Sequence, residues 1–417
     1  MLLQTVAKRA LTVILLKVYH IQSLGGTMYN FDYAVPRRNL NACKYLNVGD
    51  DLLPMSIADM EFAAPEEVQQ ALHRRVDAAN YGYTMMVEED YNAVIDWCRK
   101  RHGSEIPYDH LLATPGVLNT MRCSMYALTQ AGDRVLVVRP LHTPSIRSAS
   151  MQGRIGCVSD LLRTADGNYT FDFEDIEQHF KSGVKVMMLC SPHNPTGRVW
   201  TRNELETLSS LVIKYSVTVI SDEIHRDLIL PGNTHIVLAD LPDMQERVIT
   251  VFSGSKTFNL GGCHIGSAVI ADSKLRQRVR EKLYEFGHEC GRPPLFSLIA
   301  QTTAYRQCGA YADGLIAYLD KNVDLAMEYL QDLPVFAVRP QASFLLWVDC
   351  SQLKLNTEEL TAMLARAGII ADPGHYYDTS DIHNYHGLQH HFRLAIGMPR
   401  KMLETAMSKL RRELQRF

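Results

Sequence analysis

The sequence lacks both a long apolar run and a paired-cysteine motif. It contains no uninterrupted apolar stretch of about 18 residues or more, so no transmembrane helix is predicted. The nine cysteines are scattered and never spaced as C-x-x-C, which excludes a zinc ribbon and a thioredoxin-like motif. An odd number of dispersed cysteines is typical of free thiols in a reducing compartment, so we expect a cytoplasmic protein.

An excess of one charge is also absent. Lys and Arg number 43 and Asp and Glu 46, and the net charge of −3 argues against general electrostatic binding to nucleic acid. We therefore expect neither a nucleic-acid nor a membrane partner. With 25 glycines and 17 prolines, the chain is neither collagen-like nor of low complexity. Its 417 residues are enough to bury a large core and favour two or three domains.

The first 27 residues have two interpretations. Two basic residues precede a short apolar run over 10–16, which Lys17 ends, and this pattern loosely resembles a signal peptide. No small-residue cleavage site follows, so secretion is not expected. Either 1–27 is an N-terminal extension of uncertain role, or translation starts at Met28 and these residues are upstream sequence.

From about residue 65, helix patterns and strand patterns alternate. Short apolar runs rich in β-branched residues are typical of strands buried on both faces. The predicted strands are 134–138, 184–190, 217–221, 248–252 and 266–271. The predicted helices are 65–79, a run from the turn at 114–116 to about 130, 203–216 and 273–287. This alternation predicts a mostly parallel sheet that helices cover on both sides.

After about residue 310, long predicted helices flank only a few strands. The helices are 311–332, 356–367 and 400–416, and the clearest strand is 343–349. We interpret this region as a smaller α+β domain that the N-terminal segment joins. The expected organisation is 1–27 as the extension, 28–62 as the joining segment, 63–305 as a large domain and 306–417 as the small domain.

Polar clusters follow the predicted strands, where open α/β sheets place their ligands. They are 191–197 (SPHNPTG), 221–225 (SDEIH) and 253–259 (SGSKTFN), together with the turn 114–117 (TPGV) that enters a helix.

Lys256, Asp222 and Asn194 in these clusters fit one cofactor. A lysine alone is most often a surface residue, but a desolvated lysine can form a Schiff base with a carbonyl group. A carboxylate opposite a pyridine nitrogen keeps that nitrogen protonated and makes the ring an electron sink. An asparagine amide can donate to the ring's phenolate oxygen, and a helix N-terminus can hold a phosphate. These are the requirements of pyridoxal 5′-phosphate (PLP).

The ordered motifs at 194–197, 222–225 and 253–256 resemble the fold-type-I PLP enzymes of the aspartate aminotransferase superfamily. The finer likeness is to the C–S lyase branch, the cystathionine β-lyases that include maltose-regulon-modulator-like proteins. Further similar segments are 57–62, 81–84, 192–200, 256–260 and 397–400. The resemblance covers roughly 28–417. It implies an α/β fold, with a three-layer large domain around a mostly parallel sheet and a smaller α+β domain.

The resemblance also implies a role for each motif residue. Lys256 would bind the cofactor and remove the Cα proton, and Arg393 would bind the substrate's α-carboxylate. Tyr83 would reach the phosphate of the neighbouring subunit, so a homodimer is expected, and Asp59 would line the substrate entrance. The other expected cofactor contacts are Gly116, Val117 and Ser253 at the phosphate with Ser255 nearby, Asn194 and His225 at the phenolate oxygen, Asp222 at the pyridine nitrogen, and His142 against the ring.

Four positions depart from the family's pattern. His264 takes the place where many aminotransferases have a phosphate-binding arginine, which fits the lyase branch better. His142 stands where a ring-stacking tyrosine is usual, and we expect its titration to add a pH dependence. Ala395 replaces a common asparagine and Gln341 a common glycine. These changes bear on the choice of substrate more than on the cofactor.

The histidines at 383, 386, 390 and 391 crowd together before Arg393. No Cys or carboxylate accompanies them at a metal-binding spacing, so we expect a solvated loop near the site entrance and no metal.

The leading hypothesis is a PLP-dependent C–S β-lyase. It would cleave cystathionine or a related cysteine S-conjugate, a small sulfur-containing amino acid, to pyruvate, ammonia and a thiol. The first alternative is a class I/II aminotransferase, which uses the same carbanion and needs an amino acceptor. The second is a PLP-binding regulatory protein that contacts a transcription factor.

Overall fold

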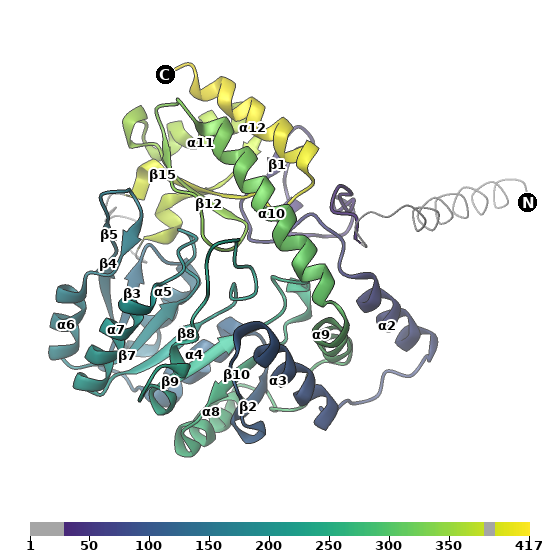
Figure 1. Ribbon diagram of the computed structural model, residues 1–417, viewed down its shortest axis with the longest axis vertical. Helices are drawn as coiled ribbons and strands as arrows, with labels where there is room; N and C mark the ends of the chain where they lie inside the picture. Colours follow the sequence, from purple (N-terminus) through teal and green to yellow (C-terminus); the bar gives the residue numbers. More distant parts are fainter. Residues whose placement is uncertain (1–28, 379–387) are drawn as a thin grey trace, which may run out of the picture. The chain divides into compact units, whose positions relative to one another are not determined.

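The computed structural model describes residues 29–378 and 388–417, apart from the side chains of residues 143 and 146. A seven-stranded sheet organises the unit Phe31–Phe417. Its strands are β2 (Leu111–Thr114), β3 (Arg134–Arg139), β4 (Ile155–Asp160), β7 (Val184–Cys190), β8 (Thr218–Asp222), β9 (Val248–Phe252) and β10 (Gly266–Ile270). Their order across the sheet is β2-β10-β9-β8-β7-β3-β4 (Figure 1).

The sheet is mostly parallel, as predicted. β10 runs antiparallel to both of its neighbours, while the other neighbouring strands are parallel. A parallel return requires a crossover of a dozen or more residues, usually a helix. Residues 253–265, between β9 and β10, contain only a short 3₁₀ turn, so the chain returns antiparallel.

The sequence patterns do not predict the edge strands β2 and β4. β2 has only four residues, and β4 has exposed residues among its buried ones, so neither shows a long apolar run.

Helices cover both faces of the sheet (Figure 1). The side chains of β3 divide between the two faces. Val135 and Val137 belong to the core with α4 (Val117–Leu128) and α8 (Ser273–Glu285). Leu136 and Val138 belong to the opposite core, with α6 (Phe173–Lys181) and α7 (Arg202–Tyr215). Successive strand side chains point to opposite faces, so a continuous apolar run is what burial on both sides requires. The predicted three-layer architecture is confirmed.

Three further helices pack together beside the sheet. The helix predicted over 65–79 is α2 (Glu66–Asp77), which has two acidic residues in its first turn and two arginines in its last. This charge order suits the helix dipole. α2 and α3 (Glu88–His102) both pack against α9 (Leu295–Gln307).

A smaller antiparallel sheet organises the C-terminal region. Its strands are β11 (Phe336–Ala337), β12 (Leu345–Asp349), β15 (His391–Ala395) and β14 (Asp372–Pro373), in this order. The helices here are α10 (Gly309–Leu330), α11 (Thr357–Arg366) and α12 (Arg400–Leu414). β1 (Leu53–Pro54) pairs in parallel with β13 (Ile369–Ile370), so the N-terminal segment contacts this region. The domain boundary near residue 305 stays a prediction.

The expected solvated histidine loop is wrong at His391. This residue is buried in β15, and its ring stacks on Trp347 at 5.1 Å between centroids. Residues His391 to Ala395 form a strand that is buried along its whole length. The sequence pattern did not predict this strand, because histidines precede its apolar residues. His383, His386 and the extension 1–27 lie outside the described residues.

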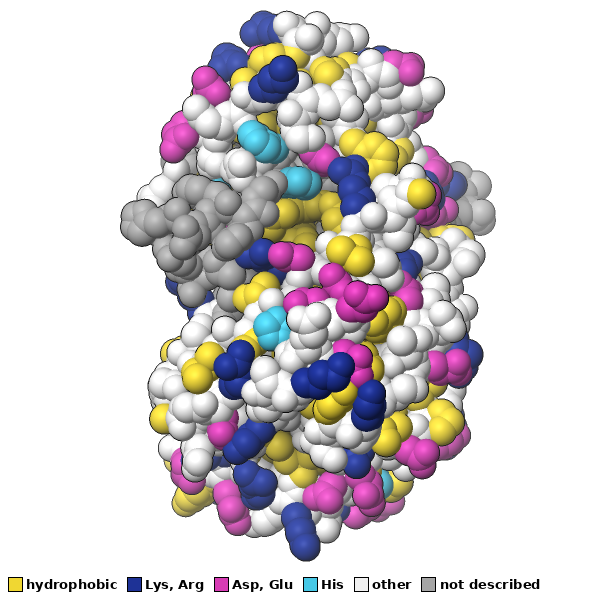
Figure 2. Space-filling view, turned by 90° about the vertical axis from the view of Figure 1, so that its left-hand side faces the viewer, with side chains coloured by type: hydrophobic (Ala, Val, Ile, Leu, Met, Phe, Trp, Pro, Cys, Tyr) yellow, Lys and Arg dark blue, Asp and Glu magenta, His cyan; other side chains and the backbone are white. Residues whose placement is uncertain are grey.

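The surface agrees with the balanced composition. On the face in Figure 2, basic and acidic side chains are interspersed. Within the described part of the chain, no helix combines the length and the apolar character needed to cross a membrane, and no group of three or more potential ligands could hold a metal ion.

Candidate active site

A cavity of about 320 Å³ lies where β7 and β8 end and where α4 begins. Neighbouring parallel strands end at the same edge of a sheet, so the polar residues that follow them converge there. The cavity lining includes eight of the predicted site residues, namely Gly116, Val117, His142, Asn194, Asp222, His225, Ser255 and Lys256.

Burial moves the pKa values of Lys256 and Asp222 toward each other. Desolvation and then the nearby charge of Arg393 lower the pKa of Lys256 to about 8. Desolvation raises the pKa of Asp222 to about 6, although the Ile224 N–H donates to its Oδ1 at 3.1 Å. An amine and a carboxyl group that both titrate close to neutral pH in one cavity are typical of an active site.

Two of the three histidines that line the cavity, His142 and His225, are uncharged at neutral pH. Burial, and then the charges of Arg393 and Lys256, lower the pKa of His142 to about 3. Burial likewise lowers the pKa of His225, whose Nδ1 lies 3.0 Å from Ser343 Oγ. The expectation that titration of His142 adds a pH dependence is therefore wrong, because desolvation keeps the imidazole neutral.

Arg393 does not line the cavity, but it contacts Asn194, which does. Its buried guanidinium donates from Nη1 to Asn194 Oδ1 at 3.0 Å. From Nη2 it donates to the Ser56 carbonyl and to the Asp372 carboxylate, each at 2.5 Å. Its Nε has no hydrogen-bond partner among the described residues.

Besides Arg393, three predicted residues do not line the cavity. The Ser253 hydroxyl donates to the Ile265 carbonyl at 2.7 Å, and Ser255 rather than Ser253 faces the cavity. The Asp59 carboxylate forms an ion pair with Arg37. Tyr83 is fully exposed in this single chain and lines an adjacent hollow. Their roles stay predictions.

That hollow connects Tyr83 with the cavity. It shares Asn119 and His264 with the cavity lining. Tyr83 therefore lines a hollow that adjoins the cavity.

The segment 56–62 closes one side of the site, and it includes the motif 57–62 of the family resemblance. Lys256 Nζ donates to the Ala58 carbonyl at 2.5 Å. Asn259 fixes the segment by donating to the carbonyls of Met60 and Phe62 at 3.1 and 2.6 Å. The resemblance pointed to this segment, but no sequence pattern indicated which of its carbonyls Lys256 and Asn259 would bind.

A buried ion pair supports the same segment. Lys44 Nζ lies 2.8 Å from Glu61 Oε1, and both side chains are fully buried. Tyr45 donates to the second oxygen of Glu61 at 2.9 Å. No sequence pattern marked Lys44, because an isolated lysine is ordinarily exposed.

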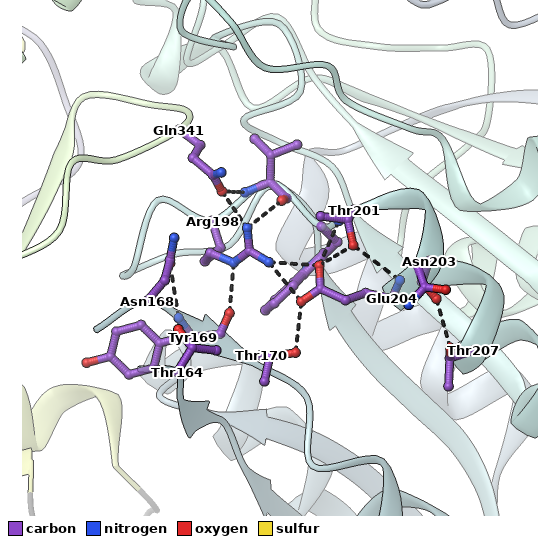
Figure 3. A network of polar contacts seen from close by, with 12 residues as sticks. Thr164, Asn168, Tyr169, Thr170, Arg198, Thr201, Asn203, Glu204, Thr207 and Gln341 are labelled. Atoms are coloured by element: carbon purple, nitrogen blue, oxygen red, sulfur yellow. Dashed lines mark hydrogen bonds and ion pairs between the residues drawn. The ribbon is translucent and has the colours of Figure 1, made fainter. Parts of the chain in front are cut away.

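Gln341, which stands where the family's pattern has a glycine, makes specific hydrogen bonds. Its Oε1 accepts hydrogen bonds from Arg198 Nη1 at 2.7 Å and from the Val199 N–H at 3.0 Å (Figure 3). Arg198 also pairs with Glu204 at 2.7 Å. This network joins the loop before β12 to the loop that carries Asn194.

The comparisons with known proteins agree with this geometry. The sequence matches the family "Aminotransferase class I and II" over residues 48–410, and the chain belongs to this family. It is 36% identical over 358 residues to cystathionine beta-lyase PatB of Bacillus subtilis (strain 168). This match covers 84% of this chain and 92% of PatB. The chain is 28% identical over 398 residues to protein MalY of Escherichia coli (strain K12), with coverage of 92% and 98%.

Solved structures give the same result. Cystalysin from Treponema denticola, which contains a PLP cofactor, matches with a TM-score of 0.87 at 28% identity and covers 94% of this chain and 100% of its own. A PLP-bound putative aminotransferase from Clostridium difficile 630 matches with a TM-score of 0.88 at 31% identity, with coverage of 93% and 100%. The recognition of the fold-type-I family is confirmed. The protein is a PLP-dependent enzyme of the aminotransferase family.

The raised pKa of Asp222 predicts a pH-dependent change in stability for the cofactor-free protein. The unfolded carboxyl titrates near 3.9, and the folded one at about 6, so the folded state holds this proton more tightly. Asp222 therefore destabilises the folded state as the pH rises from 4 to 7. Asp222→Asn should raise the free energy of unfolding, relative to wild type, by up to about 2–3 kcal/mol over this range. Urea unfolding at several pH values measures it.

Asp50→Asn is the matched control, because the Asp50 side chain is 95% exposed. Its effect should be independent of pH between 4 and 7. An effect of Asp222→Asn that is equally flat would contradict the burial argument.

The backbone conformation and close packing of Gly197 predict that its replacement by alanine destabilises the protein. Gly197 has a φ of +70°, and an added Cβ would lie 2.5 Å from Pro340 Cβ. Gly103 has a φ of +65° with nothing within 4 Å of such a Cβ. Gly103→Ala should cost about 1–2 kcal/mol for the left-handed backbone alone. Gly197→Ala should cost more, because the loop before β12 must also move. Thermal denaturation of both variants compares them, and equal losses would refute the clash.

Proposed function

We propose that this protein is a PLP-dependent C–S β-lyase that cleaves cystathionine or a related cysteine S-conjugate to pyruvate, ammonia and a thiol. The observation that carries the proposal is the placement of Lys256 and Asp222 in one cavity, with Arg393 reaching it through Asn194. The names of PatB and cystalysin among its relatives support the lyase over other reactions of the family.

The cavity residues fit PLP. Gly116 has a φ of +95°, which favours glycine, and Gly116 and Val117 at the start of α4 line the cavity, so this helix entrance is open to a ligand. The first N–H groups of a helix are free to hold phosphate oxygens. Asp222, Asn194 and the neutral His142 would meet the ring nitrogen, the phenolate oxygen and the ring face. When bound, PLP supplies a protonated ring that accepts the electron pair left by the Cα–H bond.

The chain's own residues would then act in sequence. Arg393 and Asn194 hold the substrate's α-carboxylate and orient the Cα–H bond. Lys256 Nζ takes the Cα proton, which requires a neutral amine, and its lowered pKa provides one near neutral pH. The Cβ–S bond breaks and sulfur leaves as a thiolate. The 2-aminoacrylate that is released hydrolyses to pyruvate and ammonia.

We also propose that the protein acts as a homodimer with the active site at the subunit interface. Tyr81, Tyr83, Met85 and Val87 are each more than half exposed. Tyr81 and Tyr83 line the hollow that shares Asn119 and His264 with the cavity. Burial of these apolar side chains by a second copy would bring its Tyr83 to the phosphate end of the site.

A direct assay separates the lyase from an aminotransferase. Incubation of the holoenzyme with L-cystathionine should release pyruvate and a free thiol without an added keto acid. Strict dependence on a keto acid, with no thiol released, would support the aminotransferase and contradict the proposal.

Lys256→Ala tests the assigned base. We expect it to lower kcat by about 10²–10⁴-fold, the usual contribution of a positioned acid or base. Lys274→Ala, a change at an exposed lysine on α8, should leave kcat unchanged. Equal activity of the two variants would remove Lys256 from the mechanism.

A further inference from the structure

Asp372 already binds the guanidinium of Arg393, the group that we assign to the substrate's α-carboxylate. It lies directly opposite Arg393 in the β14–β15 ladder, where cross-strand side chains are neighbours. Its Oδ2 accepts a hydrogen bond from Arg393 Nη2 at 2.5 Å. The hydroxyl of Tyr377 donates to the same oxygen at 2.9 Å, so the carboxylate is held from two sides.

The remaining donors of Arg393 do not form a complete pair. A bidentate carboxylate needs two adjacent N–H groups, either Nε with Nη2 or Nη1 with Nη2. Both pairs include Nη2, which donates to Asp372 and to the Ser56 carbonyl. One Nη1 proton goes to Asn194. The Nε proton is unpartnered among the described residues.

From this geometry we propose that Asp372 is an internal competitor of the substrate's α-carboxylate for Arg393. The inference rests on the proposed function, in which Arg393 binds that group. An incoming carboxylate must take Nη2 from Asp372 before it can bind with two hydrogen bonds. Asp372 therefore lowers the affinity of the site for α-carboxylates and restricts it to ligands that also gain from other contacts, such as amino acids that reach Lys256.

The competing role and a purely positioning role predict opposite results. If Asp372 only orients Arg393, its removal weakens substrate binding. If it competes, its removal strengthens binding and leaves the chemical step unchanged. Asp372→Asn keeps the side-chain shape and removes the charge, so the direction of the change in KM separates the two.

The experiment uses the holoenzyme with two probes. The KM for L-cystathionine should fall about tenfold in Asp372→Asn, and kcat should change less than twofold, because a charged hydrogen bond of ordinary strength is no longer displaced. The dissociation constant for 3-(methylthio)propionate, a carboxylate without an amino group, should also fall about tenfold by calorimetry.

Two further variants keep the result interpretable. Tyr377→Phe removes one hydrogen bond to Asp372 and should lower the KM and the dissociation constant by a smaller factor. Asp160→Asn removes a carboxylate that pairs with Arg139 and is 60% exposed, and it should change neither constant. A rise in KM, or no change in either constant, would overturn the proposal.

The outcome is distinguishable from a failure of the lyase assignment. If wild type releases no thiol from cystathionine, calorimetry with 3-(methylthio)propionate still measures the competition. Tighter binding to Asp372→Asn that Arg393→Lys abolishes would support the competing role. Binding that is insensitive to Arg393→Lys would refute it.

Discussion

Burial of a charged amine beside a charged carboxyl group is the constraint on which the site depends. Lys256 and Asp222 follow or end two neighbouring parallel strands, β9 and β8, so the sheet brings them to one edge. Desolvation disfavours both charged forms, which lowers the pKa of the lysine and raises that of the aspartate. An ordinary surface pair would keep both charges and would provide no base near neutral pH.

The segment 56–62 holds the two cations of the site. Ala58 accepts from Lys256, and Ser56 accepts from Arg393, so two backbone carbonyls of one segment fix a lysine from the turn after β9 and an arginine of β15. The segment needs its own supports, because a carbonyl in a loose loop would not order a long side chain. Asn259 and the buried ion pair of Glu61 provide them. The removal of a partner from such a buried pair is costly, so Lys44 helps to fix this segment.

The sequence predicted the parts of the fold that local patterning controls. The apolar runs at 184–190 and 248–252 match β7 and β9, because strands buried on both faces need no polar alternation. It did not predict β15, since a run of histidines precedes its apolar residues. The contact of Asp372 with Arg393 depends on strand register between residues 21 positions apart, and no local pattern reports that register. Asp59 and Ser253 were assigned by resemblance alone, and each side chain is bonded elsewhere in the structure.

Charge balance explains how such a site can accept two anionic groups. Lys256 and Arg122 line the cavity and Arg393 reaches it through Asn194, against the carboxylates of Asp222 and Asp372, while His142 and His225 are neutral. The three cations therefore exceed the two carboxylates by only one charge. A phosphate at the entrance to α4 thus depends largely on backbone N–H groups and the helix dipole, in agreement with the histidine at position 264. No helix dipole assists a substrate carboxylate at Arg393, so it can bind there with two hydrogen bonds only by replacing an anion that is already present.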